Sequence, residues 1–388
     1  MYNVLLVIFI LSAYAIVHSY VVYPLWLLSF TSDKKQLKPR YTLQDNLPEV
    51  AILMAAYNEE KVIGEKIASV METTYPLKKI TVYIGSDAST DKTDSIIEDY
   101  VRKYPQVKLI RFGGRTGKSG IINQLAGQAE EAIFILTDAN VIFYPETIFN
   151  MVRHFKNGNI AQVAANIIKV SASNKGIASQ EKSYIALENK IKYFESLRWN
   201  VIMGAEGGCY AIRRESFSPV PKNFYMDDFY ITLNVIEQGK EIVFDKEAIC
   251  NEDVPTQSQE EFKRKVRISI GNFQNLDRYK KLLWKFNGIS LAFWSHKVLR
   301  WLTPFFLIVC FLSSALLIIY SKVFLILFVL QIFGFITPVI DRVLNINFSL
   351  LRFISHFYLM NLALLKGFII YMKGVETNVW QPTKRETA

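Results

Sequence analysis

The stretch Val50-Ala51-Ile52-Leu53-Met54-Ala55-Ala56-Tyr57-Asn58-Glu59-Glu60 decides the fold. Its first seven residues are all apolar, without alternation, as in a parallel strand that is buried on both faces. The residues that follow are aromatic or polar, as at the end of such a strand. We therefore predict a buried strand over Val50–Ala56 and a helix over Glu59–Glu72.

Short apolar runs and amphipathic segments continue to alternate along the chain. They predict further strands over Ile80–Ser86, Val107–Phe112 and Ala132–Thr137. They predict helices over Asp91–Lys103, Gly117–Glu130 and Pro145–Phe155. This series is typical of an α/β domain, Rossmann-like in architecture, with an open parallel sheet and helices on both faces. Ligands of such sheets bind beyond the carboxyl ends of the strands, so the residues that follow each strand form the candidate site.

Polar segments follow the first two predicted strands, at Ala55–Glu60 and Gly85–Asp91. Tyr57 in the first segment could stack on a nucleobase. Asp87 in the second could accept a hydrogen bond from the base or the ribose. Helix capping by the Asn, Thr and Asp side chains of the two segments is the alternative interpretation.

The segments after the third and fourth strands suit a diphosphate. Gly113–Gly120 lacks the Walker A spacing, but it places Arg115 and Lys118 at a helix N-terminus. After the fourth strand, Thr137-Asp138-Ala139-Asn140 carries a carboxylate and, two residues later, a second oxygen ligand. This pattern suits a divalent cation that bridges a nucleotide diphosphate, and an Asx turn is the alternative.

The composition indicates a membrane protein, because 51% of the 388 residues are hydrophobic and only 21% are charged. The charge-free run Val4–Phe30 exceeds the ~20 residues that cross a bilayer. A cleaved signal peptide is disfavoured, because no positive charge precedes the run and no small-residue cleavage site follows it. Leu302–Ser321 and Val323–Ile340 predict two more spans, and Phe353–Met372 spans the membrane or lies in its interface.

Basic residues flank the apolar runs on the side of the α/β domain, at Lys34, Lys35, Lys38 and Arg40 and again at Lys280, Lys281, Lys285, Lys297 and Arg300. The positive-inside rule then places that domain in the cytoplasm. This placement accounts for much of the net charge of +10, so we expect no nucleic-acid partner. The expected regions are a membrane helix (1–30), the cytoplasmic domain (41–284), an interfacial amphipathic segment (285–301), membrane segments (302–372) and a tail (373–388).

The motifs in this order resemble the membrane-bound members of glycosyltransferase family 2, which include cellulose, chitin and hyaluronan synthases. The resemblance runs through Ala55–Glu60, Ser86–Asp91, Gly117-Lys118, Thr137–Asn140, Gly204–Arg214 and Met226-Asp227-Asp228. It implies a GT-A fold, a nucleotide-sugar donor with a UDP-sugar favoured, Mg or Mn, and an inverting transfer. The acceptor would be a surface glycan or a lipid-linked molecule at the plasma membrane.

The resemblance also implies roles for individual residues. Nucleotide-sugar binding would fall to Tyr57, Glu59, Asp87, Lys118 and Asp138. Asp138 and Asn140 would hold the metal, with Asn140 in place of the family's usual second acid. The acceptor would meet Gly207, Gly208 and Asp227, with Asp228 as the catalytic base.

A basic segment near residue 265 matches the family's Gln-Arg-x-Arg-Trp motif only in part, because Ile268 stands where Trp belongs. Its cations Arg264, Lys265 and Arg267 would bind the departing diphosphate. A basic helix that rests on anionic lipid is the alternative interpretation. The missing Trp puts processive chain elongation in doubt.

The sequence therefore predicts a membrane-bound glycosyltransferase that acts on a surface polysaccharide or a glycolipid. The alternative is a catalytically silent nucleotide-sugar receptor or a scaffold of a polysaccharide synthase complex. A transporter is disfavoured, because the apolar runs contain almost no ionisable residues. Cys209, Cys250 and Cys310 are too scattered for a disulfide framework or a zinc site and are expected to be structural.

Overall fold

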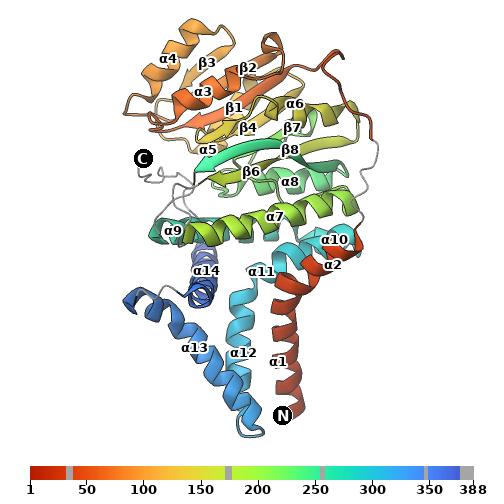
Figure 1. Cartoon of the computed structure of the whole chain (residues 1–388), viewed down its shortest axis with the longest axis vertical. Helices are drawn as coiled ribbons and strands as arrows, with labels where there is room; N and C mark the ends of the chain where they lie inside the picture. The colour runs from red at the N-terminus through yellow and green to blue at the C-terminus, as the bar shows by residue number, and fades with distance from the viewer. Residues whose placement is uncertain (32–37, 171–176, 254–257, 345–347, 376–388) are drawn as a thin grey trace. The chain divides into compact units, whose positions relative to one another are not determined.

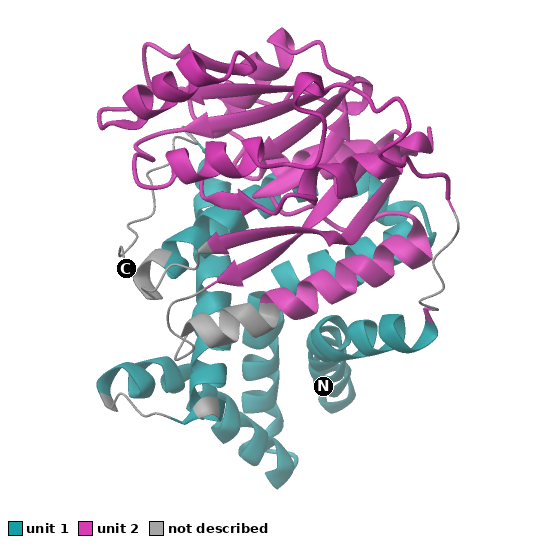
Figure 2. Ribbon diagram, turned by 45° about the horizontal axis from the view of Figure 1, so that its top comes forward, with its two compact units in different colours: residues 1–30, 173–183, 256–375 teal, residues 31–172, 184–255, 376–388 magenta. Residues whose placement is uncertain are grey.

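The computed structural model describes the chain except for residues 32–37, 171–176, 254–257, 345–347 and 376–388. It divides into two compact units, which Figure 2 shows in teal and magenta. The sheet unit comprises the described residues of 31–172 and 184–255. The helical unit comprises residues 1–30, 173–183 and 256–375.

The sheet unit is built on one sheet of eight strands in the order β3-β2-β1-β4-β7-β6-β8-β5. The strands are β1 (Val50–Ala56), β2 (Ile80–Ser86), β3 (Val107–Arg111), β4 (Ile133–Thr137), β5 (Val141–Phe143), β6 (Ile160–Val170), β7 (Cys209–Arg213) and β8 (Glu241–Asp253). The helices that accompany them are α3 (Ile63–Met71), α4 (Thr93–Lys103), α5 (Lys118–Gln128), α6 (Thr147–Val152), α8 (Asp227–Glu237) and, from residue 184 onward, α7 (Ile177–Trp199). Figure 1 shows β1 to β4 side by side.

The first four strands are parallel, and their carboxyl ends share one edge of the sheet. Every residue of β1 is buried, as the unbroken apolar run predicts. Ala56 at the end of β1 pairs with Ser86 at the end of β2, and Ser86 pairs with Arg111 at the end of β3. The residues that follow these strands therefore gather at the same edge, as the sequence predicts.

The antiparallel strand β7 brings a second chain segment to that edge. Thr137 at the end of β4 pairs with Cys209 at the start of β7. The amide of Asp138 donates to the carbonyl oxygen of Gly208 over 3.1 Å. The glycine pair that precedes β7 therefore lies directly beside the residue that follows β4.

The predicted bounds of β1 and β2 agree with the structure, and β3 and β4 are each one residue shorter than predicted. The first helix differs more, because α3 begins at Ile63 and not at Glu59. Asn58 adopts a positive φ of 52°, which interrupts helical geometry. The amide of Glu59 donates a hydrogen bond to the hydroxyl of Thr93 over 2.8 Å, and residues 57–62 form a loop at the sheet edge.

The helical unit contains α1 (Tyr2–Val17), α2 (Tyr23–Phe30), α9 (Ser258–Tyr279), α10 (Gly288–Ala292), α11 (Leu299–Trp301), α12 (Thr303–Leu317), α13 (Lys322–Leu344) and α14 (Ser349–Lys373). Short π-helical segments, His18–Val22 and Phe293–Val298, join α1 to α2 and α10 to α11. Among the described residues, three helices are long and apolar enough to cross a membrane, namely Tyr2–Phe30, Lys322–Val343 and Leu350–Lys373.

The apolar run predicted at Leu302–Ser321 forms a helix of only 15 residues, α12. It passes the same test only together with the preceding segment Gly288–Trp301, from which it is bent by 63°. The described residues thus provide three candidate spans, or four if the bent pair counts as one. The run Phe353–Met372, predicted as spanning or interfacial, lies within one of the three.

Replacing Gly204 with Ala should destabilise the sheet unit more than the same change at Gly239. Both glycines have a positive φ, 96° at Gly204 and 73° at Gly239. A Cβ at Gly204 would lie 2.6 Å from Cδ2 of Phe229 on α8, whereas nothing lies within 4 Å at Gly239. We expect a loss of roughly 3 kcal/mol at Gly204 and roughly 1 kcal/mol at Gly239, measured by chemical denaturation of the full chain. Equal losses would show that the contact with α8 does not require a glycine.

Candidate functional site

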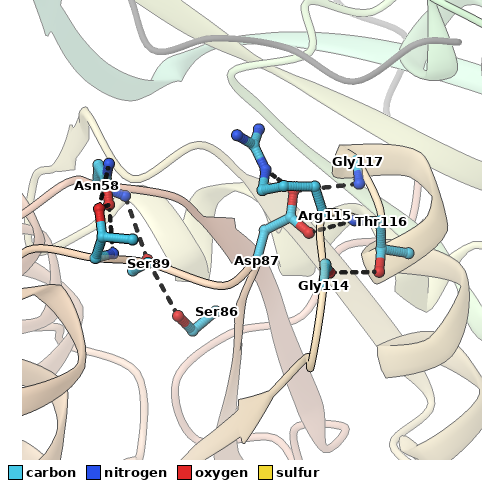
Figure 3. A network of polar contacts seen from close by, with 9 residues as sticks. Asn58, Ser86, Asp87, Ser89, Gly114, Arg115, Thr116 and Gly117 are labelled. Carbon is cyan, nitrogen blue, oxygen red and sulfur yellow. Dashed lines mark hydrogen bonds and ion pairs between the residues drawn. The ribbon is translucent and has the colours of Figure 1, made fainter.

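Asp87, directly after β2, is a buried carboxylate that organises the glycine-rich loop after β3. Its two oxygens accept hydrogen bonds from the amides of Thr116 (2.5 Å) and Gly117 (3.2 Å) and from Nε of Arg115 (3.0 Å). Figure 3 shows these contacts converging on Asp87. Only 1% of its surface is exposed, so the loop satisfies the carboxylate almost completely.

Tyr57, after β1, lies against the same loop. The guanidinium of Arg115 stacks 3.3 Å from the centre of its ring. An arginine that both stacks on an aromatic ring and pairs with a buried acid is held in a fixed position. Tyr57, Asp87 and Arg115, which come from three different strand ends, thus form one cluster.

The two polar segments after β1 and β2 are joined by hydrogen bonds. The side-chain oxygen of Asn58 accepts from the amide of Thr90 over 2.8 Å, and the amide of Asn58 donates to Ser89 over 3.2 Å. Asp91 accepts from the amide of Thr93 at the start of α4, so the capping interpretation applies to this residue. Glu59 is 8% exposed, and its amide is held by Thr93.

Lys118, the first residue of α5, connects the end of β4 to the start of α8. Its ammonium lies 2.6 Å from Oδ1 of Asp138, 3.9 Å from Oδ2 of Asp227 and 3.3 Å from the carbonyl oxygen of Gly207. Burial by itself lowers the pKa of Lys118, but the carboxylates of Asp138 and Asp227 outweigh burial and raise it above its ordinary value. Lys118 is therefore a permanent cation between these acids.

One loop thus contacts both strand-end acids that the sequence singled out. Its amides at residues 116 and 117 bind Asp87, and its next residue, Lys118, pairs with Asp138. Asp87 and Asp138 therefore border one region at the carboxyl edge of the sheet.

A buried lysine supports the turn after β4 from below. Lys66 on α3 is fully buried, donates to Oγ1 of Thr137 (3.0 Å) and to the carbonyl oxygen of Val141 (2.5 Å), and lies 3.3 Å from the ring centre of Phe143. These two hydrogen bonds hold the residues on either side of the turn that contains Asp138. Burial lowers the pKa of Lys66 to about 8.

Asn140 contacts an acid that the sequence did not single out. Its amide nitrogen lies 3.4 Å from Oε1 of Glu252, whose other oxygen accepts from Lys169 over 2.5 Å. Glu252 lies on β8 and reaches this edge because β8 pairs antiparallel with β5, with Val141 opposite Glu252. No local sequence pattern links residues that lie 112 positions apart.

Asp227 and Asp228 begin α8 and are about 90% buried, with exposures of 9% and 8%. Gly207 lies against Asp228, since a Cβ added there would be 2.9 Å from its Oδ2. Burial and, after it, the neighbouring charge of Asp227 raise the pKa of Asp228 to about 7. A carboxylate with such a pKa exchanges protons readily at neutral pH.

Tyr210 is a further residue of this region that the sequence did not assign. It is 1% exposed, and its hydroxyl has no hydrogen-bond partner in the described part of the chain. Burial and then the charges of Asp227, Asp228 and Asp138 raise the pKa of Tyr210 well above its ordinary value. The sequence gives no signal for this residue, because Tyr210 is the second residue of β7 and a tyrosine is ordinary in a β-strand.

The remaining predicted residues divide between the two units. Gly208 packs tightly, as a Cβ there would lie 2.9 Å from Ile167. Arg264, Lys265 and Arg267 lie on α9 in the helical unit, where the first two contact Glu261 at 3.5 Å. Their assignment to the diphosphate stays a prediction.

Comparison with known proteins decides the family. Residues 51–220 match the family described as Glycosyl transferase family 2, and residues 141–338 match Glycosyl transferase family group 2. The chain belongs to glycosyltransferase family 2. The predictions of the family and of the GT-A fold are thus confirmed.

Two curated relatives show which family 2 enzymes this chain is similar to. It is 34% identical to a β-monoglucosyldiacylglycerol synthase of Synechocystis over 110 residues, which cover 28% of this chain and 23% of the relative. It is 26% identical to a poly-β-1,6-N-acetyl-D-glucosamine synthase of Staphylococcus epidermidis over 272 residues, which cover 68% and 64%. The matches thus span from about a quarter to under two thirds of the relatives' length.

A solved structure confirms the fold. The mannosyltransferase PcManGT from Pyrobaculum calidifontis, solved in complex with GDP-Man and Mn2+, superposes with a TM-score of 0.71. The superposition covers 95% of this chain and 99% of that chain at 18% sequence identity.

The raised pKa of Asp228 should make the stability of the chain depend on pH. Its ordinary value is 3.8 and its value in the folded chain is about 7, so between these pH values the folded state binds more protons than the unfolded state. The free energy of unfolding should therefore fall as pH rises from about 4 to about 7, by up to about 1.4 kcal/mol per pH unit. Chemical denaturation across this range should show a flatter dependence in Asp228→Asn.

Asp99→Asn is the matched control, because Asp99 is an exposed carboxylate on α4 of the same unit. Its pH dependence should equal that of the unmodified chain. If Asp228→Asn keeps the full slope, Asp228 is not the group that titrates in this range.

Proposed function

We propose that this glycosyltransferase transfers a sugar from a nucleotide-diphosphate donor to a glycolipid or a surface polysaccharide, with inversion at the anomeric carbon. One observation carries the proposal: the buried carboxylate of Asp228, with a pKa raised to about 7, lies beside Gly207 at the edge where Lys118 pairs with Asp138. The proposed proton acceptor, Asp228, and the proposed diphosphate-binding group, Lys118, would then act from adjoining segments.

The donor nucleotide would bind over the ends of β1 and β2. Tyr57 would offer an aromatic ring, and Asp87 would act by holding the loop that presents Arg115 and Lys118 to the phosphates. Lys118 also begins α5, a helix of 11 residues whose dipole favours an anion at its N-terminus. We favour a UDP-sugar as the donor.

The donor set after β4 fits a hard divalent cation, Mg or Mn. Asp138 would supply a carboxylate oxygen and Asn140 a neutral amide oxygen. Among the described residues there is no group of three or more His, Cys, Asp or Glu side chains that could hold a metal, so the protein alone does not complete the coordination. Magnesium is commonly held by one or two carboxylates together with substrate phosphates and water. When bound, the cation would neutralise charge on the diphosphate.

Asp228 would act as the base of the transfer. Its carboxylate would take the proton from the acceptor hydroxyl while that oxygen forms a bond to the anomeric carbon and the bond from this carbon to the diphosphate oxygen breaks. Lys118 and Arg115 would stabilise the negative charge on the departing nucleoside diphosphate. Attack from the face opposite the leaving group inverts the anomeric configuration.

The acceptor class rests on the relatives and on the apolar helices. One relative is named for a glucosyldiacylglycerol product and the other for a polysaccharide. The candidate spans of the helical unit would keep the enzyme at the plasma membrane, where both kinds of acceptor occur. The lysines and arginines that flank these spans favour a multi-pass protein whose catalytic unit faces the cytoplasm.

Asp228→Asn should lower transfer by at least ~10²-fold, the scale typical of losing a general base. Donor binding should be kept, because the variant leaves Tyr57, Asp87 and Lys118 in place. The measurement is transfer from a panel of radiolabelled nucleotide sugars to lipid and polymer fractions of membranes that contain the protein, with Mn present. Asp99→Asn serves again as the control and should retain full activity.

The result that would contradict the proposal is donor binding without turnover in both the unmodified chain and Asp228→Asn. A nucleotide-sugar receptor would behave in this way.

A further inference from the structure

A cavity of about 80 Å³ lies in the sheet unit, away from the carboxyl ends of the strands described above. Ile160 at the start of β6 and Val243 near the start of β8 border it. β7 runs antiparallel to both β4 and β6, and β8 is parallel to β6, so β6 and β8 run in the same direction as β4. Their amino ends therefore lie at the sheet edge opposite Asp138.

The cavity wall is rich in positive charge. Its charged side chains are two acids, Asp245 and Glu247, and four cations, Lys38, Arg40, Arg153 and Lys246. His154 also lines it and is 3% exposed. Burial is the main cause of the lowered pKa of His154, and the charges of Arg40 and Arg153 act in the same direction. Leaving His154 aside, the cations of the wall exceed its acids by two.

Part of this charge is matched within the protein. Arg153 pairs with Asp245 at 2.7 Å and with Glu247 at 2.6 Å, both through Nη2. Nε2 of His154 lies 2.6 Å from the same oxygen of Asp245. Lys38 pairs outside this group, with Glu241 at 2.8 Å. The two acids of the wall are thus already engaged by Arg153 and His154.

Two donors of the wall are left without a matching acceptor. Arg40 forms no hydrogen bond or ion pair with any described residue, although it lines the cavity and acts electrostatically on His154. Nε of Arg153 is buried and has no hydrogen-bond partner in the described part of the chain. Leaving a buried charged donor unsatisfied is costly, so Nε of Arg153 calls for an acceptor, and the half-buried guanidinium of Arg40 lines the same cavity.

We propose that this cavity binds a phosphoryl group, held by Arg40 and by Nε of Arg153 at the amino edge of the sheet. A phosphoryl group supplies several acceptor oxygens and matches the planar donor fork of arginine. The volume exceeds the ~10–15 Å³ that one water needs and falls far short of the ~300 Å³ at the lower end of whole-ligand pockets. The cavity therefore accommodates the phosphoryl end of a molecule, while the rest of that molecule remains outside.

This site is distinct from the one proposed for sugar transfer, and its ligand has two sources to distinguish. One is a soluble phosphate compound, and the other is the phosphodiester of an anionic lipid. Both present the same oxygens to Arg40 and Arg153, so the chemistry is shared and the experiment must separate the sources.

The test is hydrogen–deuterium exchange of the full chain in nanodiscs. In the first arm, inorganic phosphate is added to nanodiscs of phosphatidylcholine. In the second arm, the nanodiscs also contain phosphatidylglycerol and no inorganic phosphate is added. We expect protection of the peptides over 153–157 and 241–247 in at least one arm. Protection by phosphate indicates a soluble source, and protection by phosphatidylglycerol indicates a lipid. No protection of these peptides in either arm overturns the proposal.

The variants Arg40→Gln and Lys156→Gln form a matched pair. Lys156 is a neighbouring cation, but it pairs with Asp45 and does not line the cavity. Arg40→Gln should lower the affinity for the ligand that gives protection by about 10-fold or more, whereas Lys156→Gln should leave that affinity unchanged. Protection over 113–118, at the other edge of the sheet, reports phosphate at the catalytic site and should be the same in both variants.

Unchanged protection in Arg40→Gln would overturn the proposal. Arg40→Lys should recover part of the affinity, which separates loss of the ligand contact from damage to the fold.

Discussion

The ammonium of Lys118 is the contact on which the proposed site depends. It lies between the carboxylate of Asp138, at the end of β4, and that of Asp227, at the start of α8. Asp228 adds a third carboxylate in the same region, and like charges so close together disfavour their joint ionisation. A fixed cation among them allows three acids to share one edge of the sheet.

The backbone makes this arrangement possible. The hydrogen bond from the amide of Asp138 to Gly208 fixes the glycine pair beside β4, and Gly207 then leaves room for Asp228. Beneath the turn, Lys66 ties Thr137 to Val141. Positions in the site are thus set by residues from α3, β4, β7 and α8, which lie far apart in sequence.

Much of this site could be predicted from the sequence, because a short apolar run is enough to show where a buried strand ends and which residues follow it. The apolar runs that end at residues 56, 86 and 137 identify Tyr57, Asp87 and Asp138, and parallel pairing then brings these ends together. The role of Asp228 as base is assigned only through the family resemblance, since nothing in its own segment distinguishes a base from a helix cap.

Other parts of the structure depend on long-range pairing that no local pattern reveals. The strand β8 contains Asp245-Lys246-Glu247 where its register against β6 shifts, so it lacks the alternation that identifies a strand. The sequence therefore does not predict a role for Glu252, although Glu252 contacts Asn140. Lys66 and Tyr210 were missed for a related reason, because burial of a polar group becomes visible only once the neighbouring elements are in place.

The most direct test of the account is the pH dependence of sugar transfer in Lys118→Gln, with Lys118→Arg as the control. The charge of Lys118 lowers the pKa of Asp228, in opposition to burial and to Asp227. Without it, Asp228 should hold its proton to higher pH, so the acidic limb of the profile should move upward by about one pH unit or more, while Lys118→Arg keeps the original limb. An acidic limb that stays in place in Lys118→Gln would contradict the account, because Lys118 would then not act on the proposed base.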